Sequence, residues 1–351
     1  MTSAPLRLRL DSAALAGNWR SLDALSGDAA CGAAVKADGY GLGAEQVVAA
    51  LAAAGCRDFF VATWAEAAAL AGIGVSVVVL HGVRAEDMAV ALSGIARPVL
   101  NSAEQVARWR SAGGGLCDIM VDTGMNRLGI AARNIASGLL DGLMIDTLMS
   151  HLACADEDSA MNESQRKAFA SLVGATSARR MSLANSAGIG LGRAFAFDLT
   201  RPGLALYGGV PRPELAAMRQ VAYPEAQIVQ RRRVRAGETV GYNATYTART
   251  DTEVAIVHIG YADGYWRGFS GSGTARMEGA VLPVIGRVSM DLAAIDVSAA
   301  PALAEGDWVS MEYALPEAAR RSGLSQYELL TGLGNRFDII MTESRAEKAI
   351  C

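Results

Sequence analysis

Hydrophobic and polar positions follow a repeating pattern from about residue 30 to about residue 210, where short apolar runs alternate with helical stretches. The apolar runs include "CGAAV", "DFFVA", "VSVVVL", "LCDIMVD", "LMIDTLMSH" and "GLALYG". Counted together they make about eight candidate strands, the number that closes a (β/α)8 barrel. A doubly wound open sheet has the same rhythm, but no Gly-x-Gly-x-x-Gly follows an early strand, so a dinucleotide-binding fold is not supported.

Two of the helical stretches carry capping signals. Thr63 and Glu66 have capping-box spacing at the start of "TWAEAAALAG", where a side-chain oxygen of each residue would accept a backbone N–H of the other. Asn101 precedes the periodic stretch "SAEQVARWRSAG", and it is the N-cap that we predict for that helix.

The pattern changes after about residue 220. Stretches such as "AQIVQRRRV", "TEVAIVHIGY" and "DWVSMEY" alternate apolar and polar residues between glycine-rich turns, which is typical of antiparallel strands. We therefore predict an α/β protein with a (β/α)8 TIM barrel over 1–222 and an antiparallel β domain over 223–351. The first strand, "LRLRLD", precedes the barrel, and we expect it to join the β domain.

Composition excludes several classes of protein. The 351 residues are 51% hydrophobic and 19% charged, which favours a large core over disorder. The net charge of -4 gives no reason to expect a nucleic-acid or membrane-surface partner. No segment reaches the roughly 18 uninterrupted apolar residues of a membrane span, and the start, "MTSAPLRLRLD", lacks the apolar stretch of a signal peptide.

Cysteines and histidines argue against disulfides and against a metal site. The five cysteines, at 31, 56, 117, 154 and 351, are odd in number and form no Cys-x-x-Cys. The three histidines (His81, His151 and His258) lie far apart without His-x-x-x-His spacing. We expect a protein of the reducing cytoplasm without a structural metal.

Lysine usage singles out Lys36 in "AAVKADGYGLGA". Of the 32 basic residues, only Lys36, Lys167 and Lys348 are lysines. Surface charge is thus carried by arginine, and a lysine that ends an apolar run is a candidate nucleophile, because burial readily shifts the pKa of lysine. The alternative is a lysine that reaches the surface from a strand end.

Polar residues follow five of the predicted strands, at the end of a barrel where active sites form. They are Lys36, Arg127, His151, the pair Asn185 and Ser186, and Arg201 with Gly203. Taken singly, each has a structural alternative. His151 could be a core histidine, Asn185 and Ser186 a helix cap, and Arg127 or Arg201 the cation of a salt bridge. Together, an amine, small hydroxyls and an arginine that donates to a ring nitrogen are suited to pyridoxal phosphate.

Motifs across nearly the whole chain resemble the alanine racemase family of fold-type III pyridoxal phosphate enzymes. "AAVKADGYGLGA" resembles the family's cofactor-lysine signature, and "VDTGMNRLG", "SHLACADE", "ANSAGI", "RPGLALYG", "GYNATYTA", "GYADGY" and "GRVSMDL" follow in order. The resemblance implies racemisation of L- and D-alanine with pyridoxal 5'-phosphate, supplying D-alanine for peptidoglycan or degrading it. It does not choose between these two roles.

The resemblance also implies roles for individual residues. Lys36 would hold the cofactor as a Schiff base and act as a catalytic base, with Tyr242 as the second base. The other cofactor-binding residues would be Tyr40, His151, Asn185, Ser186, Arg201, Gly203 and Leu204, with Arg201 at the pyridine nitrogen and His151 also tuning Tyr242. Arg127, Met290, Asp291 and Tyr261 would bind the substrate.

The family pattern further implies a head-to-tail homodimer in which the β domain completes the partner's active site. Chemistry supports two bases, because racemisation removes a proton from one face of the α-carbon and returns it to the other. Without the resemblance, nothing local separates Tyr242 from Tyr246.

Two positions depart from the family pattern. Met120 stands where many relatives carry a carbamylated lysine that braces Arg127, and we expect Asn126 or a bound anion to take that role. The stretch "LLTGLGNRFDII" lacks a tyrosine that some relatives place near Asn335.

Several rival functions share the barrel. A pyridoxal phosphate carrier without turnover would lack the β domain. A basic-amino-acid decarboxylase needs a cysteine-bearing loop late in the chain, and a zinc-assisted dehydratase or aldolase needs a late His/Cys pair, which His258 and Cys351 do not resemble. A broader amino-acid or serine racemase stays open.

Overall fold

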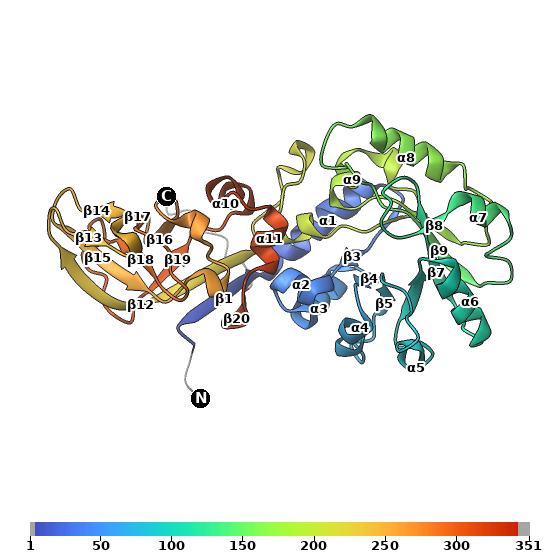
Figure 1. Cartoon of the computed structure of the whole chain (residues 1–351), viewed down its shortest axis with the longest axis horizontal. Helices are drawn as coiled ribbons and strands as arrows, with labels where there is room; N and C mark the ends of the chain where they lie inside the picture. Colours follow the sequence, from blue (N-terminus) through green and yellow to red (C-terminus); the bar gives the residue numbers. More distant parts are fainter. Residues whose placement is uncertain (1–3, 343–351) are drawn as a thin grey trace.

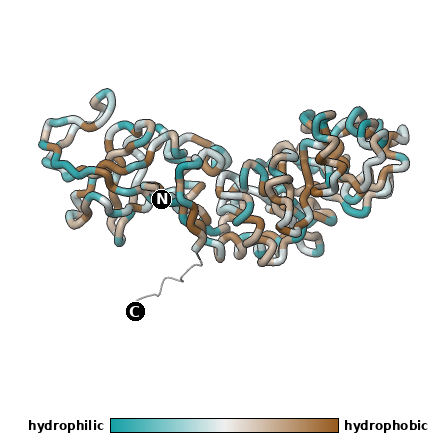
Figure 2. The backbone as a smooth tube through the Cα atoms, turned by 90° about the horizontal axis from the view of Figure 1, so that it is seen from below, coloured by the Kyte–Doolittle hydropathy of each residue, from teal (hydrophilic) through white to brown (hydrophobic). Residues whose placement is uncertain are grey.

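The structure, a computed structural model, describes residues 4–342. Its elements form two parts that lie one after the other along the long axis of the molecule (Figure 1). One part contains helices around parallel strands, and the other contains mostly antiparallel strands. Figure 2 shows hydrophobic residues gathered inside both parts and hydrophilic residues in the outer loops. Within the described residues, no helix is both long and apolar enough to cross a bilayer.

Short parallel strands form the inner wall of the first part: β2 Ala30–Cys31, β3 Ala33–Ala34, β4 Asp58–Val61, β5 Ser76–Val79, β6 Arg97–Leu100, β7 Cys117–Asp122, β9 Ile145–Met149, β10 Arg180–Ser182 and β11 Leu199–Thr200. They pair in the order β3-β4-β5-β6-β7-β9-β10, and β11 pairs with β2. Between β10 and β11, which are not paired as strands, the N–H groups of Asp198 and Arg201 donate to the carbonyls of Met181 and Ala184 at 2.9 and 2.8 Å. The predicted (β/α)8 barrel is confirmed.

Helices follow the strands and cover the barrel: α1 Ser12–Ser26, α2 Lys36–Gly41, α3 Ala44–Ala54, α4 Trp64–Ala69, α5 Met88–Ala91, α6 Ala103–Ser111, α7 Ala132–Ala136, α8 Ala160–Ala170 and α9 Ser186–Gly190. The capping box of α4 is confirmed, because Thr63 accepts from Glu66 and Glu66 accepts from Thr63. The predicted N-cap of α6 is wrong. Ser102 caps that helix, while the Asn101 amide donates to the carbonyls of Leu80 and Val99 and joins two strand ends.

The second part is built on β1 Leu6–Asp11, β12 Ala222–Val234, β15 Thr252–Val257, β16 Thr274–Met277, β17 Ala280–Ile285, β18 Ala293–Asp296, β19 Trp308–Met311 and β20 Asp338–Thr342. These strands pair in the order β15-β18-β17-β16-β19-β12-β1-β20, and β12 also pairs with β15. Strand β1 pairs antiparallel with β12 and parallel with β20. The N-terminal strand therefore lies in the sheet of the C-terminal part.

Two features outside this sheet matter for the site. The hairpin of β13 (Thr239–Val240) and β14 (Tyr246–Thr247) lies at the end of the molecule away from the barrel (Figure 1). Helices α10 (Leu315–Ser322) and α11 (Gln326–Thr331) lie between the two parts. The Gln326 amide accepts from the N–H of Val210 at 2.8 Å and donates to its carbonyl at 3.0 Å, which fixes α11 to the barrel.

Candidate active site

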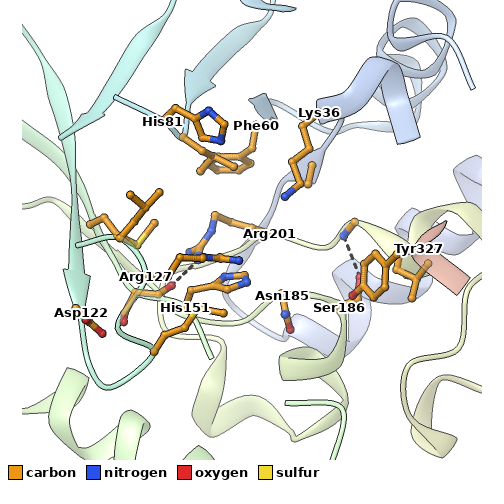
Figure 3. A pocket seen from close by; sticks show the side chains of 18 of the residues that line it. Lys36, Phe60, His81, Asp122, Arg127, His151, Asn185, Ser186, Arg201 and Tyr327 are labelled. Carbon is orange, nitrogen blue, oxygen red and sulfur yellow. Dashed lines mark hydrogen bonds between the residues drawn. The ribbon is translucent and has the colours of Figure 1, made fainter. Parts of the chain in front are cut away.

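A cavity of about 420 Å³ opens where the parallel strands end, which we call the mouth of the barrel. It is lined by Arg127 and by all eight cofactor-site residues predicted from the sequence: Lys36, Tyr40, His151, Asn185, Ser186, Arg201, Gly203 and Leu204. In Figure 3, the side chains of Lys36, Arg127, His151 and Arg201 point toward a common space, with Ser186 beside it. Residues far apart in the sequence are thus brought together by the strand ends.

Lys36 reaches the mouth because the chain turns sharply after β3. The four residues 37–40 all have left-handed backbone angles, with φ of 53, 53, 64 and 59°. Three of them, Ala37, Asp38 and Tyr40, are not glycine, so this left-handed turn costs roughly 1–2 kcal/mol per residue. It carries Lys36 and Tyr40 to the same cavity.

The cavity concentrates positive charge. Within the described part of the chain, Lys36, Arg127 and Arg201 form no ion pair with a carboxylate. Burial, and then the charge of Arg127, hold the pKa of Lys36 below its usual value. Burial and the neighbouring cations lower the pKa of His151 to about 3, so its imidazole is neutral. An anion is the ligand that this set of charges favours.

One side of the cavity is built from small groups held close together. The Ser186 hydroxyl is buried and accepts the N–H groups of Gly203 and Ala205 at 2.9 and 3.1 Å. A Cβ at Gly203 would clash with the hydroxyl oxygen of Tyr40, so a larger residue there would displace the Tyr40 side chain. Asn185 is the N-cap of α9 and accepts from Gly188 at 2.8 Å, so its structural alternative also holds.

Arg201 crosses the floor of the cavity and is only 6% exposed. Its guanidinium donates to the Ser182 hydroxyl and, at 2.6 Å, to the carbonyl of Ser150. Burial lowers the pKa of Arg201 to about 10, which still leaves it charged near neutrality. The fixed guanidinium can only donate hydrogen bonds, so a ring nitrogen placed against it would have to accept.

The loop of Arg127 is shaped by Asp122, which the sequence analysis did not select. Its carboxylate accepts the N–H groups of Gly124 and Asn126 at 2.9 and 3.1 Å. Asn126 has φ of 55°, and its side-chain amide donates a hydrogen bond to the carbonyl of Gly124 rather than bonding to the guanidinium of Arg127. The expected brace from Asn126 is therefore absent in the described residues, and Met120 lines the cavity nearby.

The remaining predicted residues lie in the other part of the chain, away from this cavity. Tyr242 begins a short turn, Tyr242–Ala244, at the tip of the β13–β14 hairpin and is 67% exposed. Met290 is exposed, and Asp291 pairs with Arg336 at 2.7 Å. Tyr261 lies under the guanidinium of Arg267 at 4.9 Å. One chain does not bring these residues to its own Lys36.

Other residues line the cavity that the sequence analysis did not choose, among them Phe60, His81 and Tyr327. His81 lies two residues after the end of β5, so the rule that used polar residues after strands could have found it. Tyr327 comes from α11, with its ring 6.4 Å from that of Tyr40, and no local signal marked it. In residues 4–342 no cluster of acidic, histidine or cysteine side chains is suited to a metal. Cys351 lies outside the described residues.

Comparisons with known proteins cover both parts of the chain. Residues 10–211 match the family model for the alanine racemase N-terminal domain, and residues 221–341 match the one for the C-terminal domain. An alanine racemase of Acidiphilium cryptum is 43% identical over 94% of this chain and 97% of its own length. A biosynthetic alanine racemase of Agrobacterium fabrum is 42% identical over 95% of this chain and 93% of its own.

One further relative is named as a catabolic enzyme, and one solved structure contains a bound ligand. A catabolic alanine racemase of Mesorhizobium japonicum is 42% identical over 94% of this chain and 91% of its own. The solved structure of the Bartonella henselae alanine racemase, with covalently bound pyridoxal phosphate, is 32% identical. It has a TM-score of 0.87 over 97% of this chain and 100% of its own.

Proposed function

The chain belongs to the alanine racemase family, a pyridoxal-phosphate-dependent isomerase, and we propose that it interconverts L- and D-alanine with two bases from two subunits. One base is Lys36, and the other is Tyr242 of the partner subunit. The observation that carries this proposal is the split site. A cavity with a perturbed amine lies in the barrel, whereas Tyr242 is exposed at the far end of the same chain.

The residues at the mouth fit pyridoxal phosphate. Lys36 would offer the amine for its covalent attachment, and Tyr40, Ser186, Gly203 and Leu204, which line the same cavity, would hold its phosphate. A residue larger than Gly203 would displace Tyr40 from this place. When bound, the cofactor makes the α-proton of an attached amino acid acidic by delocalising charge. Arg201 would hold the ring nitrogen unprotonated, which limits that delocalisation and restrains side reactions.

Lys36 and the tyrosine would divide the proton transfers between them. The amine would serve one face of the α-carbon, and burial lowers the pKa of Lys36 toward the range where it can accept a proton. The phenol of the partner's Tyr242 would serve the opposite face. Neutral His151 lies among the cations of the cavity, where it would orient that phenol.

Alanine would bind through its carboxylate. Arg127, which has no carboxylate partner of its own in the described residues, supplies the charge for it. Met290 and Asp291 of the partner subunit, with the partner subunit's Tyr261, would close the pocket. A narrow pocket of this kind favours a small substrate over a long basic one.

A head-to-tail homodimer follows from this division of the site. In it the barrel, residues 1–222, would meet the partner's β domain, residues 223–351. The four described cysteines are free, which supports activity in a reducing cytoplasm. Relatives carry both biosynthetic and catabolic names, so the proposal covers both supply of D-alanine for peptidoglycan and its degradation.

Complementation between two inactive variants tests the shared site. Lys36→Ala and Tyr242→Phe are each purified and assayed for D-alanine formation from L-alanine, then mixed under conditions that exchange subunits. A mixed dimer contains one site with both wild-type residues. We therefore expect both variants to be nearly inactive and the mixture to regain up to about a quarter of the wild-type activity per chain.

Two results would contradict the proposal. If Tyr242→Phe keeps full activity in both directions, the second base is another group. If both variants are inactive and the mixture remains inactive although a tagged pull-down detects mixed dimers, the tyrosine acts within its own chain. Assays with L-serine, L-lysine and L-arginine measure how broad the substrate range is.

A further inference from the structure

We propose that Glu66 is a positioning residue for Lys36, because its carboxylate joins the N-terminus of α4 to the left-handed turn that presents the lysine. This inference rests on the proposed role of Lys36. Glu66 was recognised from the sequence only as a capping residue. In the structure it does more than cap its own helix.

The two oxygens of the Glu66 carboxylate serve two different segments. Oε1 accepts the N–H of Ala37 at 2.8 Å. Oε2 accepts the N–H groups of Ala62 and Thr63 at 2.6 and 3.2 Å. Ala37 directly follows Lys36, and Ala62 directly follows strand β4. One side chain therefore ties the lysine turn to the end of the neighbouring barrel strand.

The turn needs an external hydrogen bond because its backbone is unfavourable. Ala37 has φ of 53°, in a region that non-glycine residues rarely adopt. At the far end of the turn, the Asp38 carboxylate accepts the N–H of Ala44 at 2.8 Å, and the Asp38 carbonyl accepts that of Gly43 at 2.9 Å. At the near end, in the described residues, the Ala37 N–H is held by Glu66.

The charge of Glu66 also acts on the lysine. Burial and Arg127 lower the pKa of Lys36, and Glu66 partly opposes them by raising it. In the described residues, the amine forms no ion pair with any carboxylate. The carboxylate thus influences both the direction of Lys36 and its protonation without touching the reacting atoms.

Substitution by glutamine separates these roles from simple capping. The glutamine side chain keeps the size of glutamate but has one oxygen acceptor. It can accept the N–H of Ala37 or the N–H groups of Ala62 and Thr63, but it cannot serve both segments. Thr63→Ala is the matched control, because it weakens the same helix cap and leaves the Ala37 contact intact. The double variant Glu66→Gln with Ala37→Gly relieves the strain, because glycine adopts a positive φ freely.

The holoenzymes are compared by kcat and KM for alanine, by the pH dependence of kcat/KM, by the rate of pyridoxal phosphate release followed in its visible absorption, and by Tm. We expect Glu66→Gln to lower kcat between about 10- and 100-fold, to shift the pH profile and to speed release, with little change in KM. Thr63→Ala should lower Tm and keep the wild-type kcat. The double variant should recover part of the kcat that the glutamine variant loses.

Other outcomes overturn the inference. One such outcome is that Glu66→Gln keeps the kcat, the pH profile and the cofactor release rate of the wild type, whatever its Tm. Another is that Glu66→Gln and Thr63→Ala lose kcat equally. If Glu66→Gln does not fold, the double variant carries the test, and failure to obtain folded, active enzyme from it counts against the inference. Lys36→Ala is assayed alongside: if it stays active, the proposed function fails independently of Glu66.

Discussion

The two ends of the barrel hold arginines in opposite surroundings. At the mouth, Arg127 and Arg201 lie beside Lys36 without any ion pair to a carboxylate in the described residues. At the other end, where the parallel strands begin, arginines and aspartates alternate in a network that we call the closed end: Asp58, Arg97, Asp118, Asp146 and Arg180.

Both arginines of the closed end form ion pairs with aspartates. Arg180 contacts both oxygens of Asp58 at 2.9 and 3.0 Å and Asp146 at 2.7 Å. Arg97 pairs with Asp118 at 2.9 Å and with Asp146 at 3.0 Å. The network joins β4, β6, β7, β9 and β10, so it holds the barrel wall together. Removing one member of a buried ion pair destabilises a fold, whereas cations gathered without carboxylate partners are available to a ligand.

Removing the amine at the mouth is the largest expected effect on activity. Lys36→Ala should lower kcat by about 1,000-fold or more, because the proposed base and the point of cofactor attachment are lost together. The Tm should change little, because Lys36 forms no ion pair in the described residues. Racemisation rates and thermal unfolding of the same preparation measure both. A large fall in Tm would remove the contrast with the closed end.

Removing a cation at the closed end should have the reverse effect. Arg180→Leu takes the paired cation away from Asp58 and leaves Asp146 with Arg97, in a mostly buried site. We therefore expect a loss of about 3–4 kcal/mol in unfolding free energy. The kcat of the folded fraction should be unchanged. Urea denaturation measures the loss, with Arg180→Lys as a control that keeps charge without the two-pronged contact. A lysine variant as unstable as the leucine variant would show that geometry, not charge, decides.

Asp118 should make the stability of the closed end depend on pH. Burial raises its pKa from the usual 3.8 to about 6 although Arg97 opposes this. The contribution of Asp118 to stability is therefore complete below pH 3.8, its pKa in the unfolded chain. It is lost as the pH rises through about 6, its pKa in the folded protein. Relative to Asp118→Asn, the wild type should lose up to about 3 kcal/mol over this window. Denaturation at several pH values tests this, and a constant difference between the two proteins would contradict it.

The smallest expected effect concerns the edge of the mouth. Tyr327 borders the cavity from α11, and burial raises its pKa, so its phenol stays protonated. Tyr327→Phe removes the hydroxyl alone, and we expect pyridoxal phosphate to leave about fivefold faster, the equivalent of one hydrogen bond. Absorption during dialysis measures the release. An unchanged rate would show that the hydroxyl faces away from the cofactor.

Much of the barrel could be predicted from the chain because its strands are short apolar runs separated by helices. The same rule, polar residues just after strands, found Lys36, His151 and Arg201. It could also have found His81 and Asp122, which follow or end strands β5 and β7. The error at Asn101 has a physical cause. A residue that still belongs to the strand end uses its amide across the barrel, so the cap moves one residue on to Ser102.

Other features of the site had no local signal. Tyr327 reaches the cavity because α11 is fixed to the barrel through Gln326 and Val210, more than 100 residues apart in the chain. The contact from Glu66 to Ala37 also spans two strand–helix units. Pattern and spacing describe a residue's own segment, and they do not say which distant backbone groups its side chain will meet.

The sequence alone determined the class of fold, the change from parallel to antiparallel texture near residue 220, and the position of a lysine at the end of an early strand, because these depend on local periodicity and residue chemistry. Tertiary structure decided which cations stand paired and which stand free. It also decided that Tyr242 lies far from the Lys36 of its own chain, and that a capping glutamate holds a strained turn. Charge pairing and side-chain reach depend on where distant segments meet, and only the folded chain brings them together.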